Sequence, residues 1–363
     1  MKKVLVVGSA EQSCGGVAAV IRLMKQMPVW QEYHCYWLGT QIQRNYLWKL
    51  WYAVKANIIA LFIVWRYDIV HFHTVPDRQS LIIQLPIFLL ARLGRKHILM
   101  HIHMGNQLKK HTDNGLFKWC LRRADLIILL AQKWQELFQE QYTDVKTPTT
   151  VLYNPCEIVP EVPFEEKEHI IIMAALFNDN KAPDLLLRAW QKVLNDDLNP
   201  NPNLDGNVNH NDDPNLNGWK IYMLGNGEVE RYRKMAAEMG LADSVTFTGY
   251  VTGKEKENIF RRASICCVCS YEEGFPMVVL ESWAYGICVV TTPVGGLPEV
   301  LEDGRNALVF DFGDWQGLSQ RLEQLIHDEE KRREMANYAR QFVIDHFSPK
   351  QFNTELVEIY QRQ

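Results

Sequence analysis

The sequence predicts an α/β protein of two domains, each built around a doubly wound parallel sheet. Short apolar runs rich in Val and Ile recur along the chain, and segments with helical periodicity lie between them. This alternation of strand and helix is typical of a parallel sheet covered by helices. The length of 363 residues is enough for two domains with a hydrophobic core each.

The N-terminal half holds six strand-like runs, at residues 3–8, 33–38, 68–73, 97–103, 125–130 and 150–152. The loop after the first run ends in Gly15 and Gly16, and a helix is predicted to begin at Val17. Two glycines at a helix start let a ligand approach bare backbone amides. Gly15 and Gly16 are therefore candidate phosphate-binding residues.

The C-terminal half begins after an acidic, proline-containing link at residues 160–168, which predicts a first domain over 1–165 and a second over 166–346. Its apolar runs lie at residues 170–176, 220–224, 245–251, 264–269 and 288–292. Residues 195–217 are rich in Asn, Asp and Pro and lack the apolar side chains of a core. We expect this segment to be a largely disordered surface insertion.

Charge is distributed unevenly along the chain. Residues 1–165 hold 19 Lys and Arg against 12 Asp and Glu, whereas the remainder holds 20 against 31. A basic N-terminal half indicates an anionic surface or acceptor on that side. The eight cysteines form no paired framework, and Cys266, Cys267 and Cys269 are expected to be buried in a strand rather than to bind a metal. With no signal-peptide pattern before the first strand, we expect a cytoplasmic location.

Residues 44–66 combine the aromatic side chains Trp48, Trp51, Tyr52 and Trp65 with scattered Arg and Lys. This composition is typical of an amphipathic helix that lies at a membrane interface. The alternative is an unusually apolar crossover helix packed on the sheet, because residues 58–64 are apolar on every face. The longest apolar run, 58–65, is shorter than the about 20 residues of a membrane-spanning helix. The expectation is therefore peripheral contact with an anionic membrane, at the inner face of the cytoplasmic membrane.

Two His-x-His pairs end strands, His71 with His73 and His101 with His103. Within each pair both rings face the same side of the sheet. In the strand order 3-2-1-4-5, the third and fourth strands are about 14 Å apart. That separation is too large for one metal with bonds of about 2 Å, so no metal site is predicted.

The stretch SYEEGFPMVVLE at residues 270–281 follows a run expected to be a buried strand. Gly274 permits a sharp turn, and Pro276 suits the start of a helix. Glu273 then lies in the loop and Glu281 in the helix, with the free amides of the helix start between them. At the carboxyl end of a parallel strand this arrangement suits a nucleotide sugar. The same spacing also fits a Glu273 that caps the helix and a solvated Glu281.

The residues AYG at 284–286, VGGLPE at 294–299 and DG at 303–304 follow in order. Together with EGFPMVVLE at 273–281, they resemble the signature of the retaining GT-B glycosyltransferases of glycosyltransferase family 4, the glycosyl transferases group 1. The resemblance implies two facing Rossmann-like domains. The first would bind the acceptor, the second would bind the nucleotide sugar, and residues 347–363 would form a helix that packs back on the first.

The resemblance also implies roles for single residues. Glu273 would orient the donor sugar, His103 would contact its hydroxyls, and Glu281 would bind the ribose hydroxyls. The other implied donor contacts are Lys181 to the diphosphate, Val251 to the base through its backbone, and the turn residues Gly274, Phe275, Pro276 and Met277. His71, His73 and His101 are interpreted as structural or acceptor-facing. The arginine that relatives place near this lysine is replaced by Ala175, and two family glycines by Ala174 and Ala182.

The function implied by the resemblance is the transfer of a sugar from a nucleotide-sugar donor to a glycan or lipid-linked acceptor. Retention of configuration, independence from metals and a role in surface polysaccharide or lipopolysaccharide synthesis belong to the same expectation, and no cofactor or nucleic acid is expected. Two alternatives stay open. One is a degenerate member that binds a nucleotide sugar or glycan without turnover, suggested by Ala175. The other is a glycoside hydrolase that uses the two glutamates.

Overall fold

The computed structural model describes the chain except for residues 1, 14, 43–44 and 199–217. Contacts divide the chain into two compact units. Unit 1 comprises Met1–Glu157, Glu273–Met277 and His346–Gln363, and unit 2 comprises Ile158–Glu272 and Val278–Asp345. The insertion predicted at 195–217 lies outside the described residues, apart from 195–198, which continue a helix.

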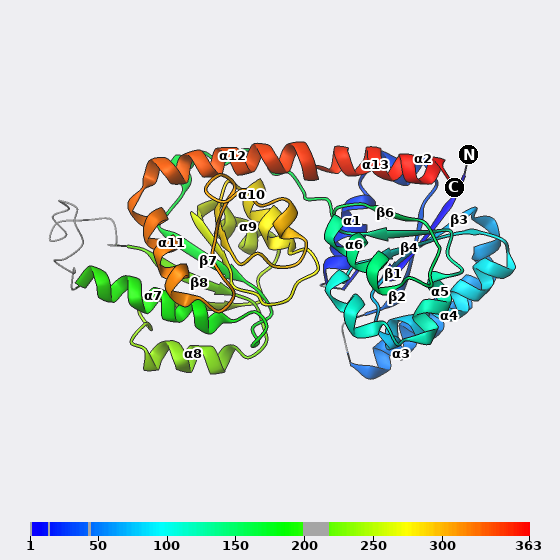
Figure 1. The fold of residues 1–363 in the computed structure, drawn as a ribbon, viewed down its shortest axis with the longest axis horizontal. Helices are drawn as coiled ribbons and strands as arrows, with labels where there is room; N and C mark the ends of the chain where they lie inside the picture. The colour runs from blue at the N-terminus through cyan, green and yellow to red at the C-terminus, as the bar shows by residue number, and fades with distance from the viewer. Residues whose placement is uncertain (1, 14, 43–44, 199–217) are drawn as a thin grey trace. The chain divides into compact units, whose positions relative to one another are not determined.

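Unit 1 is built on a parallel sheet (Figure 1). The sheet has six strands in the order β2-β1-β3-β4-β5-β6. The strands are β1 (Val4–Ser9), β2 (Tyr36–Gln41), β3 (Ile69–Thr74), β4 (His97–Ile102), β5 (Leu126–Leu129) and β6 (Thr149–Val151). The chain builds outward from β1 to β2 and then in the opposite direction from β3 onward. The order reverses between β1 and β3, and ligands of open α/β sheets bind at the carboxyl ends of strands at such a reversal.

The α-helices of unit 1 are α1 (Gly16–Met24), α2 (Pro28–Glu32), α3 (Tyr46–Ile63), α4 (Arg78–Leu93), α5 (Gly115–Leu121), α6 (Gln132–Gln141) and α13 (Pro349–Gln361). A 3₁₀ segment, η2 (Gly105–His111), follows β4. The last helix, α13, buries Phe352, Leu356, Ile359 and Tyr360 in one hydrophobic cluster with residues of α1, α2 and β1. The C-terminal residues thus complete the core of the N-terminal unit.

Unit 2 contains a second six-stranded parallel sheet, in the order β12-β11-β10-β7-β8-β9. Its strands are β7 (Ile170–Ala174), β8 (Lys220–Leu224), β9 (Val245–Gly249), β10 (Ile265–Val268), β11 (Cys288–Thr291) and β12 (Ala307–Val309). Its helices are α7 (Pro183–Leu198), α8 (Val229–Glu238), α9 (Gly253–Arg262), α10 (Met277–Ala284), α11 (Trp315–His327) and α12 (Glu329–Phe347). The first residue of α10, Met277, and the last two residues of α12, His346 and Phe347, belong to unit 1. The strand order reverses between β7 and β10.

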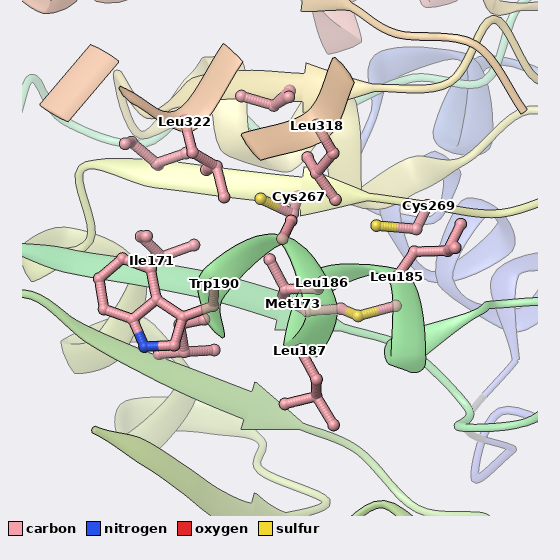
Figure 2. Packing of buried hydrophobic residues seen from close by; sticks show 14 of the residues in the cluster. Ile171, Met173, Leu185, Leu186, Leu187, Trp190, Cys267, Cys269, Leu318 and Leu322 are labelled. Atoms are coloured by element: carbon pink, nitrogen blue, oxygen red, sulfur yellow. The ribbon is translucent and has the colours of Figure 1, made fainter. Parts of the chain in front are cut away.

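The core of unit 2 forms because α7 presents one apolar face to the sheet and to α11. Leu185, Leu186 and Trp190 of α7 pack with Ile171 and Met173 of β7, as Figure 2 shows. Leu318 and Leu322 of α11 belong to the same cluster. Cys267 and Cys269 are buried there as small apolar side chains, at 1% and 0% exposure. The predicted α/β class with two doubly wound parallel sheets is confirmed.

The strand order of unit 1 differs from the order 3-2-1-4-5 expected from the sequence. That expected order was the reason for predicting no metal site between the two His-x-His pairs. β3 and β4 are neighbours, and His73 lies opposite His101 in the register of the pair. The separation of about 14 Å expected from the order 3-2-1-4-5 is wrong. In this sheet the reversal of order falls between β1 and β3, so no strand intervenes between the two histidine-bearing strands.

The helix α3 packs against β2 and α4, yet most of its apolar surface is exposed. Of its 18 residues only Ala56 and Ala60 are buried. α3 is thus a crossover helix that leaves large apolar side chains in solvent, and the membrane contact expected of this segment stays a prediction. Tyr46–Arg66 is also long and apolar enough, by length and composition, to cross a bilayer.

Candidate functional site

Two loops of unit 2 meet beside the strands where the sheet order reverses. The loop that contains Lys181 follows β7, and the stretch that leads to Glu273 follows β10, the strand next to β7. Asn180 joins them. Its side-chain oxygen accepts a hydrogen bond from the Glu272 amide at 2.8 Å, and its side-chain nitrogen donates to the Glu272 carbonyl at 2.9 Å. The Tyr271 amide donates to the Asn180 carbonyl at 2.8 Å, so three hydrogen bonds align the two loops.

Lys181 lies at the end of a turn closed by Asn178. The Lys181 amide donates to the backbone and side-chain oxygens of Asn178, each at 3.1 Å. Ala182, which stands where the family has a glycine, adopts a φ of 48°. This left-handed conformation costs a non-glycine residue about 1–2 kcal/mol. The turn thus keeps the backbone conformation of a glycine although the glycine itself is replaced.

Ala175 lies against the loop that follows β8. Its amide donates to the Leu224 carbonyl at 3.0 Å, and a side chain at Gly225 would overlap the Ala175 carbonyl oxygen. Gly225 has a φ of 152°. The sequence did not identify a second cation near this loop, Arg231 of α8. Its guanidinium forms an ion pair with Asp179 at 2.8 Å and another with Glu228. Unit 2 therefore carries an arginine near the Lys181 loop even without one at position 175.

Glu281 lies on α10, where its carboxylate accepts a hydrogen bond from Lys256 of α9 at 2.8 Å. Both side chains are about one-third exposed. Val251, which is expected to contact the base through its backbone, is 7% exposed and lies two residues before α9. The same helix carries Lys256, the partner of Glu281. Lys256 was not identified from the sequence. Its position is visible only once α9 and α10 are placed side by side.

His103 follows β4 in unit 1 and is 7% exposed. Its Nε2 lies 2.8 Å from Nδ1 of His73, so one ring donates a hydrogen bond and the other accepts it. Burial lowers the pKa of His103 to about 3. The imidazole is neutral near pH 7 and is suited to hydrogen bonding with a hydroxyl rather than to neutralising phosphate.

The turn that carries Glu273 belongs to unit 1 and lies directly against His103. A β-carbon at Gly274 would lie 2.8 Å from the His103 carbonyl oxygen, so only glycine permits this approach. Trp134 of α6 donates from its indole nitrogen to the Gly274 carbonyl at 2.8 Å. The indole of Trp134 also covers the Cα of Gly105. Trp134 is therefore a positioning residue that the sequence did not reveal.

The rest of the turn contributes in different ways. The Phe275 ring is 5% exposed and packs edge-on against Tyr153, with ring centroids 5.7 Å apart, and against Phe347 at 5.8 Å. Its side chain belongs to this aromatic cluster, so the backbone is the part of Phe275 left for a ligand. Pro276 is buried, and α10 begins at Met277.

Gly15 precedes α1 as its N-cap residue, and Gly16 is the first residue of the helix. Apart from the chain neighbours and the backbone of α1 itself, no described atom lies within 4 Å of the place where a Gly16 side chain would begin. Arg22 of α1 donates to the carbonyls of Glu11 and Ser13, at 2.7 and 2.9 Å, and so holds the preceding loop. Glu273, His103 and the start of α1 thus lie in unit 1, whereas Lys181, Val251 and Glu281 lie in unit 2.

Two Rossmann-like sheets in one chain, each with polar loops at the carboxyl ends of its central strands, define the class of two-domain α/β proteins with GT-B architecture. Residues 157–342, about half of the chain, match the model of the family "Glycosyl transferases group 1". This protein belongs to that family.

Among curated relatives, the chain is 26% identical over 195 residues to an α-1,4-N-acetyl-D-galactosaminyltransferase of Campylobacter jejuni, which acts on a diphosphoundecaprenol-linked saccharide by its name; the match covers 53% of this chain and 48% of the relative. It is 30% identical over 134 residues to the lipopolysaccharide core biosynthesis glycosyltransferase LpsE of Rhizobium meliloti, covering 37% and 39%. Matches to these relatives span about half of their length or less. Among solved structures, HepE of Anabaena in complex with UDP-glucose matches all of both chains with a TM-score of 0.74 at 17% identity, which supports the fold.

Proposed function

We propose that this protein transfers a sugar from a nucleotide-sugar donor to a glycan or lipid-linked acceptor, with retention of configuration and without a metal at the donor. The observation that carries the proposal is the junction made by Asn180, which aligns the Lys181 loop with the stretch leading to Glu273 beside the strands where the sheet order reverses. Family membership and the names of the curated relatives support the transfer reaction over hydrolysis of a glycoside.

The donor would be held by charge and by backbone. Lys181 would neutralise the diphosphate, with the free amides at the start of α10 as further donors. The ribose hydroxyls would hydrogen-bond to Glu281, whose carboxylate Lys256 holds in place by a hydrogen bond. His103, neutral because it is buried, would hydrogen-bond to a sugar hydroxyl, and Glu273 would orient the sugar. Since Lys181 and the helix amides offset the phosphate charge, no divalent ion is required there.

The acceptor side of the proposal rests on the exposed apolar surface of unit 1. We define the α3–α4 face as the large apolar side chains, 44–74% exposed, that these two helices present: Tyr46, Leu47, Trp48, Leu50, Trp51, Val54, Ile58, Leu61, Phe62, Ile82, Leu89 and Leu93. Many large apolar side chains exposed on two packed helices are typical of a membrane or protein interface. With aromatic rings and a basic N-terminal half, it favours the surface of an anionic membrane, where a lipid-linked acceptor resides. A location at the cytoplasmic membrane is part of this proposal.

The direct experiment incubates the purified protein with a panel of nucleotide sugars and follows nucleotide release with and without lipid-linked or soluble glycan acceptors. The expected result is acceptor-dependent release from one donor class, at a rate unchanged when Mg²⁺ or Mn²⁺ is added or omitted. Nucleotide binding without release would instead support a binding protein without turnover. Cleavage of a glycoside that carries no nucleotide would support the hydrolase.

A further inference from the structure

Four histidines form one buried cluster at the carboxyl ends of β3 and β4. Alternate residues on a strand share a face, so His71 and His73 lie beside His101 and His103 of the neighbouring strand. All four are 0–7% exposed. The ring centroids of His71 and His73 are 4.3 Å apart, those of His73 and His101 are 4.8 Å apart, and those of His71 and His101 are 5.5 Å apart.

Some ring nitrogens of His71, His73 and His101 have a hydrogen-bond partner, and the others have none among the described atoms. On one side, Nδ1 of His71 lies 2.8 Å from the Tyr360 hydroxyl and Nδ1 of His73 lies 2.8 Å from Nε2 of His103. On the other side, Nε2 of His71, Nε2 of His73 and both nitrogens of His101 are buried without a hydrogen-bond partner among the described atoms. A buried polar atom without a partner costs about 1–3 kcal/mol. A cation bound by the three rings would engage three of these four atoms.

One nitrogen from each of His71, His73 and His101 lies within 4.8 Å of the other two. Around a tetrahedral zinc ion with bonds of about 2.0–2.1 Å, the ligand nitrogens lie about 3.3 Å apart. To reach that geometry, nitrogens now up to 4.8 Å apart would have to approach one another by up to about 1.5 Å. We propose that Nε2 of His71, Nε2 of His73 and one ring nitrogen of His101 bind a single Zn²⁺-class cation.

The surroundings match those of metal-binding histidines. Such a histidine ordinarily engages its second nitrogen in a hydrogen bond that sets the tautomer and the ring orientation. Tyr360 supplies that contact for His71, and His103 supplies it for His73. Three imidazoles suit Zn²⁺ and other late first-row metals, whereas Mg²⁺ and Ca²⁺ require oxygen ligands. Burial lowers the pKa of His71 to about 3, so its ring is available in the neutral form that binds metal.

The position of the cluster indicates a structural role. Through Tyr360 the metal would link the adjacent strands β3 and β4 to α13, and through His73 it would fix the ring of His103. The ligands are 0–2% exposed, so the cation would not be the counter-ion of a donor diphosphate. A zinc ion at this buried site would therefore be compatible with sugar transfer that needs no metal at the donor.

The test measures metal content in the full chain without an affinity tag. After removal of metal with a chelator, the protein is equilibrated with Zn²⁺, desalted and analysed by mass spectrometry of the elements. We expect one Zn²⁺ per chain in the wild type, and none above background in His101→Leu and His71→Gln. The matched control is His97→Gln, because His97 lies exposed on the same strand and should leave the stoichiometry at one.

Two further measurements do not depend on how the variants fold. Co²⁺ should give the wild type and His97→Gln the visible absorption of a tetrahedral nitrogen site, and Zn²⁺ should raise their Tm. A wild type that takes up no Zn²⁺ and shows no such absorption would overturn the inference. So would a folded His101→Leu variant, verified by circular dichroism, that retains one Zn²⁺. Since no donor is present, neither result depends on whether sugar transfer occurs.

Discussion

Glu273 and Glu281, eight residues apart in sequence, belong to different units and differ in their surroundings. Glu273 lies in a turn pressed against His103, whereas Glu281 lies in a helix and pairs with Lys256. Their chemical roles should therefore separate on mutation. A carboxylate that binds ribose acts on donor affinity, and one beside the sugar acts on the transfer step.

We expect Glu281→Ala to weaken binding of the nucleotide sugar by about ten- to a hundredfold, the size of one lost hydrogen-bonding charge. Glu273→Gln should lower kcat more than it lowers donor affinity. Titration calorimetry and steady-state kinetics measure the two effects, with the exposed Glu257→Ala of α9 as the control. Equal and negligible effects of both variants would refute the site assignment.

The Lys181 loop gives a second test at the residue scale. Lys181→Ala should weaken binding of a nucleoside diphosphate by about tenfold or more, because it removes the lysine expected to neutralise the phosphates. Ala175→Arg restores the family residue and should tighten binding, by up to about a hundredfold. The gain will be smaller if Arg231 already supplies positive charge to this loop. Binding by Lys181→Ala that equals the wild type would place the phosphate site elsewhere.

The protonation of Lys167 should affect the stability of unit 2, because its side chain is partly buried there. Its ammonium donates to the Tyr285 carbonyl at 2.8 Å, and burial lowers the pKa of Lys167 from 10.5 to about 7. Between these two pH values the unfolded chain binds more protons at this position than the folded one, so stability rises with pH. The contribution is complete above about pH 10.5 and is lost as the pH falls toward 7.

The prediction compares the wild type with Lys167→Met by urea unfolding at several pH values. The free energy of unfolding of the wild type, minus that of Lys167→Met, should rise from pH 7 to pH 10. The slope should be below the about 1.4 kcal/mol per pH unit that one whole proton gives. Below pH 7 the difference should be constant. A difference that stays constant or falls between pH 7 and pH 10 would mean that the pKa of Lys167 is not lowered.

At the scale of the element, α3 buries only a narrow strip of its surface against unit 1. Ala56 and Ala60 allow close contact, and the larger side chains on the rest of the helix are exposed. A soluble crossover helix ordinarily buries its large apolar residues and exposes its small or polar ones. The inverted pattern supports the membrane role proposed for the α3–α4 face.

Phe62 and Leu47, exposed by 70% and 74%, give a direct test of that face. Phe62→Glu and Leu47→Glu should each lower binding to anionic vesicles by at least about tenfold, since burial of such a side chain contributes about 1.5–3 kcal/mol. Co-sedimentation measures the binding, which should also fall as salt screens the basic charge. The control is Phe312→Glu, a change to an exposed apolar residue of unit 2. Absence of vesicle binding by the wild type at low salt would contradict the proposal.

At the scale of the whole molecule, the two ends of the chain form one core. Leu356 of α13 is fully buried in the cluster that contains Val4 and Val6 of β1. Leu356→Ala should therefore destabilise unit 1 by about 2–5 kcal/mol. Hydrogen exchange should show lost protection in β1 and β3 while β7 and β10 keep theirs, with the exposed Glu358→Ala of the same helix as control. Loss of protection confined to unit 2 would be incompatible with this packing.

Much of this architecture is encoded locally. Apolar runs of strand length alternating with helical segments determine the α/β class, because each element depends on residues close in sequence. The ordered motifs from Glu273 to Gly304 likewise mark the family, since the turn at Gly274 and the helix after Pro276 need only neighbouring residues. The burial of Cys267 and Cys269 follows from the same local pattern.

What only the tertiary structure decided is which distant residues meet. The order of strands, and with it the adjacency of His73 and His101, depends on the path of the crossovers, which local periodicity does not specify. The same holds for Asn180 with Glu272, Lys256 with Glu281 and Trp134 with Gly274, partners 25–140 residues apart. Their pairing is determined by which helices and loops the sheets place side by side, and so it emerges only in the folded chain.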